Sequence, residues 1–188
     1  MNKNVVCDVA HDLIALFRSD GFDPLKRRDA IQSVLAPFIG AEEDLFQYGI
    51  KRPSPPDRTR TIFYSPELIL FLSRFGTDYR LPVHNHESWN ALMICSGAMH
   101  FTSYRRLDKG DASGRAKLEV AEERIVKAGE IGIVDRPPHD VHQLEILMKD
   151  TWMVTVAPCP EPALREIYNT SQGTYDVKPL SPLPVAVQ

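Results

Sequence analysis

The sequence predicts a mainly β domain, an antiparallel barrel or jelly roll with helices packed on its outside. Apolar residues recur at helical spacing over roughly the first 50 residues, and this period ends at the proline-rich segment KRPSPPDR at 51–58. The segments that follow are short and β-prone, and no helical pattern separates them. This succession favours an antiparallel barrel over a doubly wound parallel sheet.

The length and composition fit one globular domain. The chain has 188 residues, of which 43% are hydrophobic and 25% are charged. We expect a helical segment at 1–50 packed on a barrel at 59–157, followed by a C-terminal extension at 158–188. The three parts together are predicted to form a single domain.

Three helices are predicted before the barrel. In the first, apolar residues recur at helical spacing: Val9, Leu13, Leu16 and Phe17. Asp23 followed by Pro24 predicts the start of a second helix that runs to about Leu35. An acidic run at 42–44 begins a short third helix, which Gly49 can end.

Eight strands are predicted from short apolar or alternating segments bounded by turn residues. They cover about 59–64, 68–75, 89–95, 98–106, 116–127, 130–134, 142–148 and 151–157. Residues 161–168 are predicted to form a helical turn or two. The proline-rich ending from 177 is predicted to be an extended tail.

Charge and composition exclude several classes of partner. The formal net charge is -3, without the clustered basic excess of a nucleic-acid-binding surface. The longest apolar runs, such as 91–95, fall far short of the roughly 20 residues that span a bilayer. Three widely spaced cysteines fit a reducing compartment better than a disulfide framework. We expect a cytoplasmic protein that binds neither nucleic acid nor membrane.

Two histidines one residue apart indicate a metal site. In an extended segment His84 and His86 point to one side, while Asn85 points to the other. Further ligands must come from elsewhere, and the candidates are His100, His139 and His142. The alternative is that these histidines are hydrogen-bonded structural residues.

The spacing of these histidines resembles the two motifs of cupin barrels. The first motif is His84-x-His86 with Gly97 downstream. The second is the run from Pro137 to His142, in which His139 stands where glycine is usual. This resemblance implies a double-stranded β-helix, a jelly-roll barrel, with His142 rather than His139 as the third ligand. The carboxylate ligand of many cupins would fall at 89–91, where no carboxylate occurs.

The run HNHESWNALMICSGAMHFTSYRR resembles the bacterial thiol dioxygenases, the cysteine and 3-mercaptopropionate dioxygenase group. The resemblance covers about 59–157. It implies an oxidoreductase with three histidines around Fe(II), which converts a small thiol to a sulfinate with O2. It also implies that Arg60, in the run Thr59-Arg60-Thr61, binds the substrate carboxylate. The alternative for Arg60 is a solvated arginine at a strand end.

The chain departs from this family near the end of the barrel. The family's Ser-x-His-x-Tyr run is absent from the strand at 152–157, where Met153 and Thr155 take the serine and histidine positions. The cysteine that some members cross-link to the tyrosine falls at Ala91. We therefore expect Thr155 to face the reacting group and Tyr104 or His100 to replace the missing donor.

The leading hypothesis is an Fe(II)-dependent oxygenase of a small thiol, with the thiol and O2 as its partners and a monomer or homodimer as its assembly. A second hypothesis keeps the metal but assigns lyase, isomerase or carbon-oxidising dioxygenase chemistry. A third is a ligand-binding cupin without catalysis.

Overall fold

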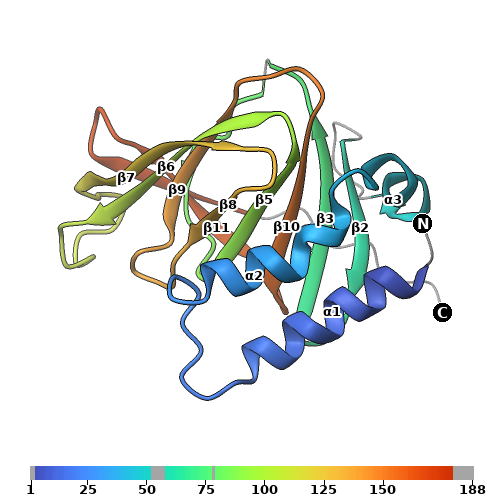
Figure 1. Cartoon of the computed structure of the whole chain (residues 1–188). Helices are drawn as coiled ribbons and strands as arrows, with labels where there is room; N and C mark the ends of the chain where they lie inside the picture. Colours follow the sequence, from blue (N-terminus) through green and yellow to red (C-terminus); the bar gives the residue numbers. More distant parts are fainter. Residues whose placement is uncertain (1–2, 52–57, 78, 180–188) are drawn as a thin grey trace.

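The computed structural model describes residues 3–51, 58–77 and 79–179 and contains two six-stranded antiparallel sheets (Figure 1). The first sheet contains, in spatial order, β1 (Ile50–Lys51), β2 (Thr59–Tyr64), β3 (Leu68–Phe75), β10 (Thr151–Pro158), β5 (Asn90–Ser96) and β8 (Ile131–Val134). The second contains β12 (Thr174–Pro179), β11 (Leu164–Asn169), β4 (Val83–His84), β9 (Val141–Ile146), β6 (Ala98–Arg106) and β7 (Leu118–Lys127). The predicted fold class, mainly β with a few helices, is confirmed.

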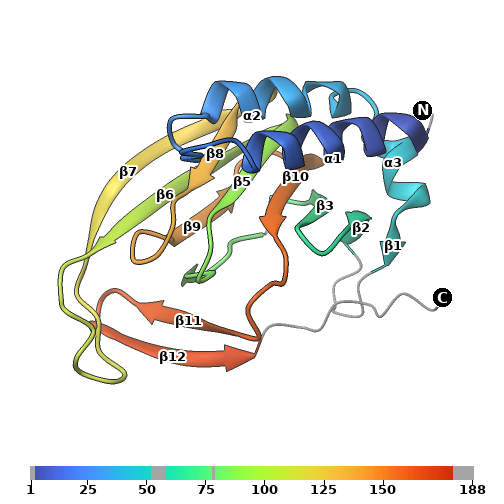
Figure 2. The ribbon, with the colours of Figure 1, turned by 90° about the horizontal axis from the view of Figure 1, so that it is seen from below.

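The helices lie on the outer face of the first sheet. They are α1 (Lys3–Phe17), α2 (Arg28–Leu35), the short 3-10 helix η1 (Ala36–Phe38) and α3 (Glu42–Tyr48) (Figures 1 and 2). Their buried apolar residues pack with the outward side chains of β3, β5 and β10 in one cluster that includes Leu13, Ile31, Leu35, Leu70, Met93 and Val154. None of the helices in the described part of the chain combines the length and the apolar character that crossing a membrane requires.

The second helix begins later than predicted. The carboxylate of Asp23 accepts the backbone N–H groups of Leu25 and Lys26, at 3.0 and 3.3 Å, which caps a turn rather than a helix. The regular helix starts at Arg28.

Strand β3 shows how the first sheet separates its two faces. Leu68, Leu70 and Leu72 pack toward the helices, because successive side chains of a strand point to opposite faces. Phe71, Ser73 and Phe75 therefore point into the space between the sheets, where they line a cavity.

Gly97 is required by the tight turn that joins β5 to β6. Its φ is +88°, a left-handed conformation that favours glycine, and a Cβ here would lie 2.2 Å from Oγ1 of Thr151. The glycine of the first histidine motif thus has a structural role, because it lets β10 pass close to this turn.

The prediction of helical turns at 161–168 is wrong. Residues 164–169 form β11, which pairs with β12 on one side and with β4 on the other, where Ile167 faces His84. The short strand β4 offers an edge that an extended segment can complete, and this pairing overrides the local pattern. Figure 2 shows the β11–β12 hairpin on the side of the molecule opposite the helices. Of the predicted extended tail, residues 180–188 lie outside the described residues.

Candidate metal centre

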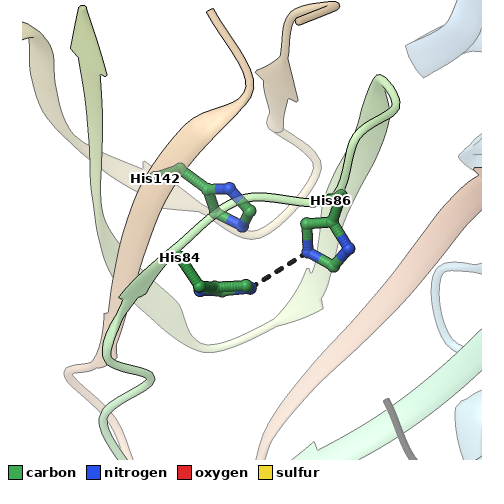
Figure 3. Close-up of side chains that lie close together, drawn as sticks. All are labelled: His84, His86 and His142. Carbon is green, nitrogen blue, oxygen red and sulfur yellow. Dashed lines mark hydrogen bonds between the residues drawn. The ribbon is translucent and has the colours of Figure 1, made fainter. Parts of the chain in front are cut away.

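The structure brings the rings of His84, His86 and His142 together between the two sheets (Figure 3). His84 and His142 are register partners on β4 and β9, and His86 follows two residues later, beyond the end of β4. The possible ligand atoms of the three residues all lie within 4.8 Å of one another. Nε2 of His84 is 3.0 Å from Nε2 of His86. The side chain of Asn85 points the other way, toward Glu166.

Main-chain carbonyl groups fix the orientation of two of the rings. Nδ1 of His84 lies 2.8 Å from the carbonyl oxygen of Pro82, and Nδ1 of His142 lies 3.3 Å from that of Asp140. When Nδ1 donates its proton to a carbonyl, Nε2 keeps a lone pair for a metal ion.

Burial keeps the three imidazoles neutral. Desolvation is the main cause that lowers the pKa of His84 to about 4 and the pKa of His86 and His142 well below the usual value. Neutral imidazoles are the form that binds divalent metals, so this cluster is ready to act as a ligand set at neutral pH.

The separation between the nitrogens of His84 and His86 suits a single ion. Two nitrogens bound at about 2.1 Å and at a right angle to each other lie about 3.0 Å apart, which is the separation between His84 and His86. Among the described residues, no carboxylate or thiolate joins this group. Three imidazoles leave further coordination positions open on one side and accept several divalent transition metals.

The three histidines line a cavity of about 210 Å³. About half of its wall is apolar and comes from Phe71, Phe75, Tyr79, Leu81, Leu92, Leu144 and Met153. The polar lining consists of Thr59, Ser73, Asn90, Thr155, Glu161 and Arg165. The hydroxyl groups of Thr59 and Ser73 are hydrogen-bonded at 2.9 Å. A small ligand in this cavity would meet directed polar groups as well as apolar surface.

The other predicted site residues divide between the cavity and its surroundings. Thr155 lines the cavity beside Met153, as the register of the missing Ser-x-His-x-Tyr run implies. Arg60 is not one of the described residues that line the cavity. Its neighbour Thr59 points inward, so Arg60 points outward, and its guanidinium lies 4.2 Å from the ring centroid of Phe46. Tyr104 packs against a separate cluster around Tyr168.

The two remaining barrel histidines lie apart from the three-histidine group. Nε2 of His100 is 2.9 Å from a carboxylate oxygen of Glu123, and the His100 side chain is partly exposed. His100 therefore neither lines the cavity nor belongs to the buried core. His139 is exposed, and its backbone N–H donates to the carbonyl of Arg136.

Sequence reasoning missed the two charged residues of the cavity, Glu161 and Arg165. Arg165 lies on β11 and is close enough for its positive charge to lower the pKa of His84, His86 and His142 further. Finding it from the sequence would have required recognising 164–169 as a strand that pairs with β4.

No family model matches the sequence, and the search of curated proteins finds no match. Solved structures with a similar arrangement include an oxalate oxidase in complex with the substrate analogue glycolate, at 23% identity and a TM-score of 0.38. That alignment covers 48% of this chain and 41% of the oxidase, so the chain spans about two-fifths of that protein. Another is a cupin-2 domain protein from Shewanella frigidimarina, at 12% identity and a TM-score of 0.41, covering 66% of this chain and 98% of the other. A third is hydroquinone 1,2-dioxygenase from Sphingomonas sp. TTNP3 with 4-hydroxybenzoate bound, at 8% identity and a TM-score of 0.44, covering 56% and 68%.

Proposed function

We propose that this chain is a cupin that binds Fe(II) through His84, His86 and His142 and oxidises a small thiol bearing a carboxylate to a sulfinate with O2. The observation that carries the proposal is the meeting of three neutral imidazoles with one arginine, Arg165, in a small cavity. In the reaction RS⁻ + O2 → RSO2⁻, both oxygen atoms end on sulfur, and no other reductant is needed.

The metal would supply a redox-active centre with open coordination positions and would favour the thiolate form of the substrate. The protein would supply the orientation. Arg165 offers paired N–H donors that match a carboxylate, so it would fix the end of the substrate remote from sulfur. The polar side chains that the first sheet contributes to the cavity are those of Thr59, Ser73, Asn90 and Thr155.

Glu161 favours a second candidate function. A carboxylate that lines the cavity can act as a general base, which direct oxygen transfer to sulfur does not need. A metal-dependent lyase or isomerase would use the same histidines together with this group.

Oxygen consumption tests the proposal. Protein loaded anaerobically with Fe(II), then exposed to O2 with thiol carboxylates such as cysteine or 3-mercaptopropionate, is expected to consume one O2 per thiol and to yield sulfinate. Metal-free protein serves as the control. If the loaded protein binds a ligand but consumes no O2 with any thiol, the oxygenase proposal is refuted. That result would support the lyase or isomerase alternative.

A further inference from the structure

A buried carboxylate lies directly behind the three-histidine group. Asp140 is 2% exposed and precedes His142 by two residues. Its Oδ2 accepts the backbone N–H of His86 at 3.2 Å. Its own main-chain oxygen lies 3.3 Å from Nδ1 of His142. One residue therefore contacts both the second and the third histidine.

These contacts matter because strand pairing in the sheet ends before His86. Strand β4 ends at His84, and the pairing with β11 holds the chain only as far as Asn85, whose backbone N–H donates to the carbonyl of Glu166 at 3.2 Å. At Glu87 the backbone turns into the left-handed region, with φ at 52°, which is uncommon for a residue other than glycine. The side chain of Asp140 binds the chain between these two points.

We infer that Asp140 is a positioning residue that sets the direction of the His86 ring and thereby completes the metal site. The backbone N–H of His86 donates to this buried carboxylate, which holds the backbone that carries the ring. The same residue orients His142 through its main-chain oxygen. This inference rests on the metal site proposed above.

The variant Asp140→Asn keeps the shape of the side chain and weakens its acceptor capacity. We expect it to bind Co(II) about 10- to 100-fold more weakly than the wild type, as is typical when a group that orients a metal ligand is lost. The visible spectrum of the Co(II)-loaded variant should also change, because that spectrum reports the arrangement of the bound imidazoles. A purely structural role would lower the melting temperature but leave the spectrum of the bound Co(II) unchanged.

Asp23→Asn is the matched control, because the Asp23 carboxylate also accepts backbone N–H groups, those of Leu25 and Lys26, but lies in the segment between α1 and α2. It should bind Co(II) like the wild type. An Asp140→Asn protein with wild-type affinity and spectrum overturns the inference while the metal site stands. Wild-type protein that binds no Co(II) overturns the metal site itself.

Amide hydrogen exchange in the metal-free wild type keeps the inference testable if Asp140→Asn does not fold. The backbone N–H group of His86 should exchange at least about 100-fold more slowly than that of the exposed Asp111, although both lie outside the strands. Rapid exchange at His86 would show that Asp140 does not hold this segment.

Discussion

Replacing His142 with alanine is expected to abolish metal binding, whereas replacing His139 with alanine is expected to leave it unchanged. His142 lies opposite His84 on the neighbouring strand, and its ring centroid is 4.4 Å from that of His84. His139 is exposed on the turn before β9 and has no part in the three-histidine group. Losing one of three imidazoles should weaken binding by more than about 100-fold, beyond the effect of losing a residue that merely orients a ligand.

Equilibrium dialysis against Fe(II) under anaerobic conditions, followed by metal analysis, measures this difference. The His139→Ala protein is the matched control, because it also loses an imidazole, three residues before His142, in the turn that leads into β9. Equal metal content in the two variants would mean that His142 is not a ligand.

Replacing Arg165 with glutamine is expected to raise the KM for a thiol carboxylate at least about 30-fold, equivalent to about 2 kcal/mol of binding free energy. Among the described residues, Arg165 is the arginine that lines the cavity. Losing its guanidinium would leave the substrate carboxylate without its charged partner in the cavity. The effect on kcat should be smaller, since the arginine would contact a part of the substrate that does not react.

Arg60→Gln is the comparison that decides between the two arginines. Arg60 lies over the ring of Phe46 on the outside of the first sheet, so its loss should cost about 0.5–1 kcal/mol of stability and leave KM near the wild-type value. A thiol without a carboxylate should be insensitive to both substitutions. If Arg60→Gln raised KM and Arg165→Gln did not, the assignment of the carboxylate site to Arg165 would be refuted.

The sequence contained enough information for most of the barrel and for the histidine cluster. Strands such as β3 and β6 are long enough for their apolar pattern to identify them, and both are found at the predicted bounds. His84 and His86 could be paired because side chains two residues apart in an extended segment share a face. The choice of His142 over His139 came from the resemblance to cupin motifs.

The pieces that escaped prediction depend on pairing between distant segments. β4 has only two residues, too few to show a period. β11 reads LREIYN, in which neither set of alternate residues is wholly apolar. Their pairing brings Arg165 to the cavity and Glu166 to Asn85, and neither contact has a local signature in the sequence. Arg60 illustrates a second difficulty, because a shift of one residue exchanges the two faces of a strand. The hydrogen bond between Thr59 and Ser73 on β3 shows which face of β2 points inward, and only the fold reveals it.

The most direct measurement is an anomalous-scattering map at the iron edge from crystals of protein loaded with Fe(II) under anaerobic conditions. We predict one peak, about 2.0–2.2 Å from Nε2 of each of His84, His86 and His142. An absence of density between these rings in the loaded protein, or an ion held by other side chains, would contradict the metal centre and with it the proposed oxygenase.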